Sequence, residues 1–265
     1  MDRNRRRKFG QNFLNNQAII DAIAGDLPVK PGDTVLEVGP GHGALTQSML
    51  ARGVKLTSVE IDSECIKFLK FKIKDPNFTL VHANFMDFDL EAWLKENPGA
   101  WIVGNLPYNM ATPILMKMLP HSHMSKGIMA MVQYEPAKRL CAVPGNKNFG
   151  HLTVMLQSYA SAYFLRKVEP KNFTPIPKVM SATIMIEGIP LDNRRQIKDG
   201  FFEFLTQSFS QKRKKLYNSL EKSYPKSKVK DALEKLKINE DIRAEAMTTD
   251  QFFDLYDLVG FPGKL

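Results

Sequence analysis

The tetrapeptide Asn105-Leu106-Pro107-Tyr108 holds the residue types in this chain that are best suited to chemistry. It follows a short apolar run, Trp101-Ile102-Val103, which predicts a buried strand. The Asn side-chain oxygen and a nearby backbone carbonyl can accept two N–H bonds, and the proline fixes the turn without adding an N–H of its own. With the flat face of the tyrosine, this arrangement suits a planar base held by its exocyclic amine. An ordinary turn without a ligand is the open alternative.

A glycine-rich turn, Gly39-Pro40-Gly41-His42-Gly43, lies between an apolar run and a helix-like segment. Glycines permit positive φ and let a ligand approach the backbone, and a helix start offers free N–H groups. Glu60 ends the next apolar run about twenty residues on, where an acidic side chain can bind the hydroxyls of a ribose. These features predict a nucleoside-bearing cofactor, with a glycine turn that binds nothing as the alternative.

Glu37 lies two residues before the first of these glycines and helps to identify the cofactor that the turn binds. With Ala44 the run also fits a loose dinucleotide pattern, so a nicotinamide oxidoreductase is a distant alternative. No Gly-Lys-Ser/Thr follows, which excludes a phosphate-binding P-loop. An acid that faces the cofactor cleft suits a cationic, amino-acid-bearing ligand better than a pyrophosphate. We therefore expect S-adenosylmethionine.

The elements that must position these residues alternate between strand and helix. The expected strands are 34–38, 54–60, 78–81, 101–104 and 128–132, and the helices between them include 44–50 and 65–73. This alternation predicts an α/β fold with a mainly parallel sheet, in which ligands bind beyond the carboxyl ends of the strands. Segments 163–165 and 182–186 are β-like and can close the sheet as a hairpin around the Pro-rich segment 173–179. After Gly188 the chain becomes helical and basic.

The charge of the chain favours a polyanionic partner. The formal net charge is +9, which adds long-range attraction to phosphate and points first to nucleic acid. The bland alternative is a basic surface that only aids solubility. The clustering of the basic residues argues against this alternative, because groups of adjacent Lys and Arg are typical of phosphate contacts. The clusters are Arg3 with Arg5–Lys8, then Lys212–Lys215, followed by Lys222, Lys226, Lys228 and Lys230.

Several classes of protein are disfavoured by composition. The only two cysteines, Cys65 and Cys141, suggest no disulfide framework and fit a reducing compartment. The five histidines show no paired metal-ligand spacing, so we expect no metal. No apolar stretch approaches a membrane span, and no signal core follows the basic start. A cytoplasmic protein without a membrane partner is expected, and nothing demands more than a monomer.

Taken in order, the motifs resemble those of the ribosomal RNA adenine N6,N6-dimethyltransferases, the family that modifies adjacent adenines near the 3′ end of small-subunit (16S) RNA. Each motif alone is a modest signal, but their order and intervals make chance a poor explanation. The matching segments are Phe9–Leu14, Glu37–Gly41, Asn105–Tyr108, Gln133 with Glu135, Arg139 and Leu140, Phe149-Gly150 before Leu152, Phe173–Val179 before Ser181, Gln211–Lys214 with Asn218–Leu220, and Arg243–Glu245.

This resemblance implies a Rossmann-like, class I S-adenosylmethionine-dependent methyltransferase fold. It implies a mainly parallel seven-stranded sheet and a small C-terminal helical domain. The expected bounds are 1–16 for a basic segment that closes over the cofactor, 17–188 for the methyltransferase domain, and 189–265 for a helical domain that binds RNA. The implied partner is small-subunit ribosomal RNA or an assembling 30S particle.

The resemblance also implies roles for single residues. Asn12 and Leu14 would close over the cofactor, and Glu60 would bind its ribose. Asn84 stands where the family usually has an aspartate, and its oxygen can still accept a bond from the cofactor's adenine amine, without charge assistance. The residues expected at the cofactor are Asn12, Leu14, Gly39, Gly41, Glu60, Asn84 and Asn105. Those expected at the RNA are Arg5, Arg6, Arg7, Lys8, Lys212, Arg213, Lys214 and Lys215.

The expected chemistry follows from the electronics of adenine, whose amine lone pair is delocalised into the ring. Bonds from the amine to the Asn105 side chain and the Leu106 carbonyl should favour a pyramidal nitrogen, which can attack a sulfonium methyl in line. By resemblance, Tyr108 and Phe173 would sandwich the flipped or unpaired base, with Pro107 shaping the turn. Ordinary packing is the alternative role for Phe173.

Two other functions compete with this interpretation. The first is a large-subunit (23S) ribosomal RNA adenine methyltransferase of the antibiotic-resistance type, which shares the fold and the cofactor. Leu106 and the segment Arg243–Glu245 favour the small-subunit enzyme. The second is a binding factor for ribosome assembly or transcription on the same fold. The intact Asn105 turn and glycine turn argue against a protein that has lost catalysis.

Overall fold

The computed structural model describes residues 12–211 and 213–260. Packing divides them into two compact units. The first runs to Ala137 and resumes over Ala160–Ile189, and the second comprises Lys138–Tyr159 and the chain from Pro190 onward. The chain thus passes between the units at three points. The functional domains expected from the sequence, with bounds 1–16, 17–188 and 189–265, stay a prediction.

The first unit is built on a seven-stranded sheet of order β4-β3-β2-β5-β6-β9-β7. The first five strands in this order, β4 to β6, are parallel to one another. Strand β9 is antiparallel to both of its neighbours, β6 and β7. The prediction of a mainly parallel sheet closed by an antiparallel pair is confirmed. The strands are β2 (Thr34–Val38), β3 (Lys55–Glu60), β4 (Phe78–His82), β5 (Trp101–Asn105), β6 (Gly127–Gln133), β7 (Ala160–Val168) and β9 (Ser181–Gly188).

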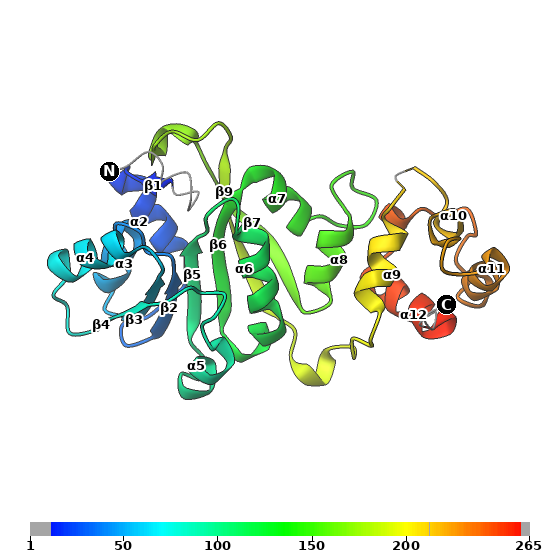
Figure 1. Ribbon diagram of the computed structural model, residues 1–265, viewed down its shortest axis with the longest axis horizontal. Coiled ribbons are helices and arrows are strands. Elements are labelled where there is room, and N and C mark those ends of the chain that lie inside the picture. The colour runs from blue at the N-terminus through cyan, green and yellow to red at the C-terminus, as the bar shows by residue number, and fades with distance from the viewer. Residues whose placement is uncertain (1–11, 212, 261–265) are drawn as a thin grey trace. The chain divides into compact units, whose positions relative to one another are not determined.

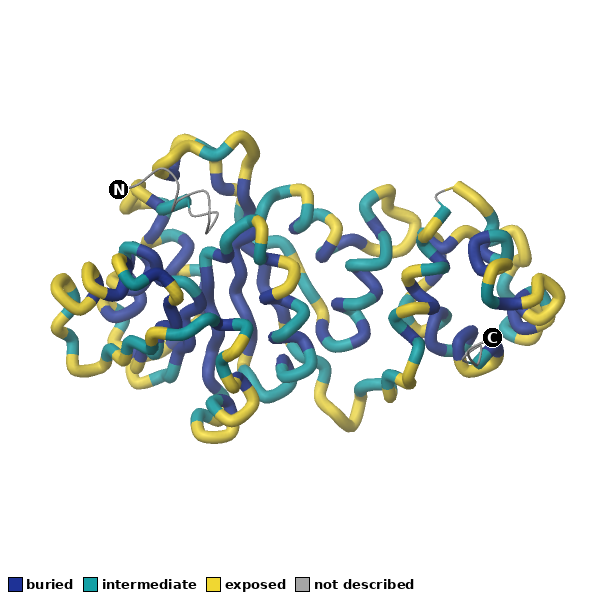
Figure 2. Tube along the Cα trace, viewed as in Figure 1, coloured by how far each residue is buried: buried dark blue, intermediate teal, exposed yellow. Residues whose placement is uncertain are grey.

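Helices cover both faces of this sheet (Figure 1). Successive strand residues point to opposite faces, and consecutive residues of β2, β5 and β6 are buried, so both faces are shielded from water. Figure 2 shows these strands as buried and the outer surfaces of the helices as exposed. The helices of this unit are α2 (Gln17–Asp26), α3 (Ala44–Leu50), α4 (Ser63–Lys72), α5 (Leu90–Glu96), α6 (Ala111–Met118) and the first part of α7 (Tyr134–Leu140).

A second, two-stranded sheet ties the N-terminal segment to a distant loop. Strand β1 (Phe13–Leu14) pairs antiparallel with β8 (Phe173–Thr174), so that Leu14 lies opposite Phe173. Asn15 and Asn16 add side-chain bonds to this loop, the first from Asn15 Nδ2 to Thr174 Oγ1 at 2.6 Å. The sequence did not predict this pairing, because two-residue strands carry no periodicity. It fixes the chain that enters the first unit.

The second unit is helical, with α8 (His151–Gln157), α9 (Phe201–Ser208), α10 (Leu216–Leu220), α11 (Lys226–Lys235) and α12 (Thr249–Val259). Its core includes Phe201 and Phe253, which are buried and whose rings stack with centroids 4.3 Å apart. Residues 138–159 join this unit through Gln157. Its amide donates to the Ala142 carbonyl and accepts a 2.7 Å bond from Thr249 Oγ1.

Neither a membrane-spanning helix nor a cluster of metal ligands occurs within residues 12–211 and 213–260. No helix there is long and apolar enough to cross a membrane. No group of three His, Cys, Asp or Glu side chains in the same ranges is arranged to hold a metal ion. Both cysteines are free thiols, Cys65 buried and Cys141 partly so. Burial raises the pKa of Cys65 to about 12, which makes it an unreactive core residue.

Candidate active site

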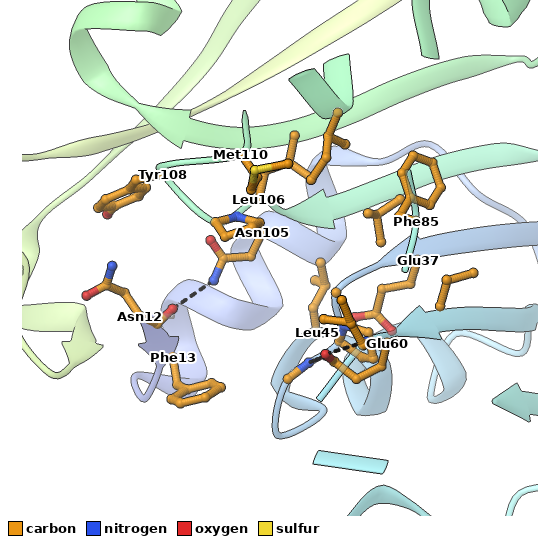
Figure 3. A pocket seen from close by; sticks show the side chains of 18 of the residues that line it. Asn12, Phe13, Glu37, Leu45, Glu60, Phe85, Asn105, Leu106, Tyr108 and Met110 are labelled. Carbon is orange, nitrogen blue, oxygen red and sulfur yellow. Dashed lines mark hydrogen bonds between the residues drawn. The ribbon is translucent and has the colours of Figure 1, made fainter. Parts of the chain in front are cut away.

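A cavity of about 300 Å³ in the first unit is lined by both turns that the sequence singled out. The glycine turn, Gly39 to His42, forms one side, and the turn from Asn105 to Met110 forms the other (Figure 3). Asn12, Phe13 and Leu14 line it from the N-terminal segment. The two predicted sites are therefore parts of one pocket.

Sheet topology brings these turns together. They follow β2 and β5, which are adjacent and parallel and lie where the strand order reverses direction. In open α/β sheets this switch point is where the crevice beyond the carboxyl ends opens. Gly104 permits the close approach, because a Cβ there would lie 2.8 Å from the Val38 carbonyl oxygen.

The glycine turn takes a backbone shape that other residues adopt only with strain. Gly39, Gly41 and Gly43 have φ of 68°, 56° and 76°. At Gly41 a Cβ would also lie 2.8 Å from the Phe13 ring. That ring stacks on His42, with centroids 4.0 Å apart and planes 5° from parallel. The N-terminal segment is therefore fitted against the turn.

Glu60 ends β3 as predicted, and its buried carboxylate holds three backbone N–H groups. Oε2 accepts from Gly41 at 2.9 Å, and Oε1 accepts from Ile61 and Asp62, both at 2.8 Å. Burial raises the pKa of Glu60, against the lowering effect of these bonds. Because a carboxylate has about four acceptor positions, about one is left, on Oε2. A ribose would use that position or displace the Gly41 N–H.

Glu37 lines the same pocket as an almost fully buried side chain, 2% exposed. Its Oε2 accepts bonds from Thr46 Oγ1 at 2.7 Å and Ser58 Oγ at 2.6 Å. Burial raises the pKa of Glu37 to about 7 despite these bonds. Neither Glu37 nor Glu60 forms an ion pair with another described residue, and the charge of Glu60 further raises the pKa of Glu37.

Asn84 lines the pocket, but both ends of its amide bind its own loop. Oδ1 accepts from the Met86 N–H at 3.0 Å, and Nδ2 donates to Asp87 at 3.1 Å. The oxygen keeps a second lone pair for a ligand amine. Lys117 holds this loop from α6, with Nζ 2.6 Å from the Met86 carbonyl and 5.7 Å from the centre of the Phe85 ring.

Asn105 is oriented by the N-terminal segment. Its Nδ2 donates a 3.0 Å bond to the backbone carbonyl of Asn12 (Figure 3). This bond identifies the nitrogen of the amide, so that the side-chain oxygen is the acceptor left at the pocket. The sequence predicted the acceptor but not the group that fixes its direction.

The rest of the tetrapeptide is anchored to the sheet. The buried Leu106 donates its N–H to the Met131 carbonyl at 3.0 Å. The Tyr108 hydroxyl shares a 2.6 Å bond with the hydroxyl of Ser181, the first residue of β9. Burial raises the pKa of Tyr108, which keeps the phenol protonated near neutrality. Both residues and Pro107 line the pocket, as expected.

The structure does not bring Phe173 to the pocket. Its side chain is 0% exposed and belongs to the core of the first unit, and it is not among the lining residues. The stacking role expected from the resemblance stays a prediction, while the structure places the Phe173 ring in the core. The reason is the pairing of β8 with β1, which turns the ring into the core opposite Leu14.

The residues expected at the RNA are only partly described. Arg5, Arg6, Arg7, Lys8 and Lys212 lie outside the described residues. Arg213 and Lys214 are exposed, and Arg213 has a φ of 68°, unusual for a residue other than glycine. Lys215 forms an ion pair with Asp241, which reduces the charge it can offer to phosphate.

Sequence reasoning missed several residues that support the pocket. Thr46 and Ser58 donate hydrogen bonds to Glu37. Ser181 is hydrogen-bonded to Tyr108, and Lys117 donates a hydrogen bond to the loop that contains Asn84. These partners are far apart in sequence, so spacing carries no signal for them. A small polar residue inside an apolar run, as Ser58 is in β3, is the one hint that could have indicated a buried partner.

Comparison with known proteins agrees with this geometry. Residues 2–260 match the family described as ribosomal RNA adenine dimethylase. The chain is 34% identical over 257 residues, 96% of this chain and 93% of the other, to the ribosomal RNA small subunit methyltransferase A of Clostridium botulinum strain Kyoto. It is 36% identical, over the whole of both chains, to the protein of the same name from Fusobacterium nucleatum.

Two solved structures resemble the fold over 94% of the chain. A dimethyladenosine transferase from Plasmodium falciparum has a TM-score of 0.79 at 24% identity, with 98% of that chain covered. The 23S rRNA methyltransferase ErmE has a TM-score of 0.70 at 25% identity, with 99% of that chain covered. The match over almost the entire sequence shows that this chain belongs to the ribosomal RNA adenine dimethylase family.

Proposed function

We propose that this protein transfers methyl groups from S-adenosylmethionine to the N6 amines of two adjacent adenines near the 3′ end of small-subunit ribosomal RNA. The product would be N6,N6-dimethyladenosine, made during small-subunit biogenesis. The observation that carries the proposal is the single pocket that joins the glycine turn to the Asn105 turn. Donor and acceptor can then meet without a covalent enzyme intermediate.

The carboxylates of the pocket support this cofactor over a dinucleotide. Glu37 and Glu60 are buried with no cationic partner among the described residues, and the charge of Glu60 adds to the cost of ionising Glu37. A ligand that bears a sulfonium and an ammonium would relieve this, whereas a pyrophosphate would be repelled. We assign the ribose to Glu60, the amino-acid end to Gly39 and Gly41, and the adenine to the Asn84 loop. When bound, the cofactor supplies an electrophilic methyl group.

The Asn105 turn would bind the target adenine and prepare its amine for methyl transfer. The Asn105 side-chain oxygen and the Leu106 carbonyl would accept the two N–H bonds of the target amine. Both acceptors also stabilise the positive charge that develops on nitrogen during attack, and a preorganised acceptor needs no rearrangement to do so. Tyr108 would stack on the base, with its hydroxyl anchored by Ser181.

The choice of small-subunit RNA rests on relatives that carry that name at 34% to 36% identity. The 23S enzyme ErmE shares the fold at lower identity, so a large-subunit target is the competing assignment. A ribosomal substrate implies action in the cytoplasm. We expect a monomer to suffice, because the described residues of a single chain bring the glycine turn and the Asn105 turn together in one pocket.

The test is methyl transfer to defined ribosomal substrates. The full chain is incubated with methyl-labelled S-adenosylmethionine and with small-subunit RNA, large-subunit RNA or 30S particles that lack the modification. Mass spectrometry of nuclease fragments should find dimethylated adenines near the 3′ end of the small-subunit RNA. Label confined to large-subunit RNA would overturn the assignment, and no label in any substrate would count against methyltransferase activity.

A further inference from the structure

Helix α4 presents an unusual surface to solvent. Its inner side, including Cys65, Ile66 and Leu69, is buried, whereas Phe71 is 84% exposed and Phe68 is 40% exposed. An exposed phenylalanine ring loses the hydrophobic stabilisation that burial would give, and exposed apolar groups rimmed by polar ones often mark binding sites. We call the following residues the α4 face: Lys67, Phe68, Lys70, Phe71, Lys72 and Lys74.

The lysines of the α4 face are largely free of acidic partners. Among the residues that the structure describes, only Lys67 of these lysines forms an ion pair, with Glu64 at 3.1 Å. Both side chains are well exposed, so the pair is weak. Lys72 lies 5.4 Å from the centre of the Phe68 ring, and Lys74 donates to the Lys70 carbonyl. The positive charge of the face therefore stays available to an anion.

The α4 face is continuous with the rim of the pocket. The Phe68 ring lies 5.1 Å from the His42 ring of the glycine turn. A Cβ on Gly43 would lie 2.6 Å from Leu69, which shows how closely α4 packs on that turn. Ile61, 44% exposed just before the helix, lines the pocket itself. A ligand that extends beyond the pocket on this side would meet the α4 face.

We propose that the α4 face is an RNA contact, at which an unpaired base stacks on Phe71 and the flanking phosphates bind the lysines. Lysine and phenylalanine alternate along the outer side of the helix, as phosphate and base alternate along a single strand, and aromatic rings beside basic groups are the usual platform for such strands. The proposal rests on RNA being the substrate and adds a contact outside the pocket.

The chemistry of the face favours RNA over a lipid surface. A helix that lies in a membrane buries a continuous apolar side in the lipid. In α4 the continuous apolar side packs on the protein, and the outer side interleaves each ring with charge. The charge complements a polyanion, and the separate rings suit separate bases.

The test measures binding of the full chain to a fluorescein-labelled single-stranded RNA of about 12 nucleotides, within the range of sites on such platforms. Phe71→Ala should weaken binding about fivefold or more, because stacking on one ring contributes at least that factor. The pair Lys70→Ala and Lys74→Ala should lower the slope of log K against log salt by about 1.4, since each lost phosphate contact removes about 0.7.

Matched controls are Lys55→Ala, an exposed lysine at the opposite end of β3, and Leu258→Ala, an apolar residue of α12 that is 43% exposed. Both should bind like the wild type. Thermal unfolding and cofactor affinity of every variant should be unchanged, because the substituted side chains do not line the pocket.

The proposal is overturned if the α4 variants bind RNA within about twofold of wild type. It is also overturned if they lose affinity for vesicles with anionic phospholipid while RNA binding is kept. Either result can occur with full methylation of ribosomal RNA, so it leaves the proposed function standing. Failure to methylate any ribosomal RNA would instead contradict the proposed function. The RNA-binding measurement would still show whether the α4 face contacts RNA.

Discussion

At the cofactor end of the pocket, the two buried carboxylates already accept hydrogen bonds from the protein, whereas at the Asn105 end the side-chain oxygen is oriented and keeps its acceptor positions for a ligand. Glu60 holds three backbone N–H groups, and Glu37 holds two hydroxyls. Asn105 is fixed by its nitrogen alone. The first end is preorganised by the sheet and its glycine turn, and the second depends on a separate strand, β1. The two ends should therefore respond differently to substitution.

The largest effect is expected at Asn105. Asn105→Ala removes the oriented acceptor and should lower the rate of methyl transfer by about 100-fold or more, the usual loss for one preorganised polar group. RNA binding should be largely kept. Single-turnover methylation and RNA titration measure the two quantities. Asn77→Ala, an exposed asparagine just before β4 that does not line the pocket, is the control and should have little effect. Loss of RNA binding together with transfer would count against the assigned role.

Glu60→Gln should act on affinity rather than on the chemical step. The amide nitrogen cannot accept a bond, so at least one of the backbone donors loses its partner, at a cost of about 1 to 3 kcal/mol. We expect cofactor affinity to fall about 5- to 100-fold and the melting temperature to drop. Calorimetry measures both. Glu64→Gln, on the exposed side of α4, should change neither. An unchanged cofactor affinity would remove Glu60 from the site.

Glu37 should make both stability and cofactor binding depend on pH. The folded pKa of about 7 lies above the usual 4.5, so stability from this group is full below pH 4.5 and is lost as pH rises through 7, by about 3 kcal/mol. A cationic cofactor binds the ionised carboxylate better, so its affinity should rise over the same range. Glu37→Gln should flatten both profiles in denaturant titrations and cofactor binding. A pH-dependent affinity that survives the substitution would assign it to another group.

The smallest effect is expected from Ser181→Ala. The Tyr108 hydroxyl loses its partner, at about 1 kcal/mol, while the ring keeps its place in the turn. Turnover should fall about fivefold or less, with cofactor affinity unchanged, as steady-state kinetics can measure. A fall as large as that of Asn105→Ala would show that the hydroxyl bond, and not the ring, positions the base.

The sheet and both turns of the pocket could be predicted from the sequence because each rests on local patterns. Continuous apolar runs identified β2, β3 and β5, and glycines and an acid marked the turns beside them. Phe173 could not be placed in this way, because an aromatic residue in a Pro-rich loop fits a core and a binding face equally well. Its burial depends on the β1–β8 pairing, which joins residues about 160 positions apart.

The basic regions also depend on contacts between distant segments, which local sequence patterns do not reveal. The sequence singled out Lys215, Lys226 and Lys230, yet all three form ion pairs, with Asp241, Glu221 and Glu240. It did not single out the four lysines of the α4 face, three of which have no ion-pair partner among the described residues. Charge density along a chain does not report which charges are neutralised in the fold, because the neutralising acids come from other segments.

The bond that aims Asn105 ends on a backbone carbonyl and not on the side chain of Asn12. Every amino acid supplies that carbonyl, so replacement of Asn12 leaves the bond intact in principle. Insertion of one residue between Asn12 and Phe13 would instead move the carbonyl away while β1 stayed paired. The bond that orients Asn105 therefore depends on the spacing between this position and β1, and not on the side chain that the position carries.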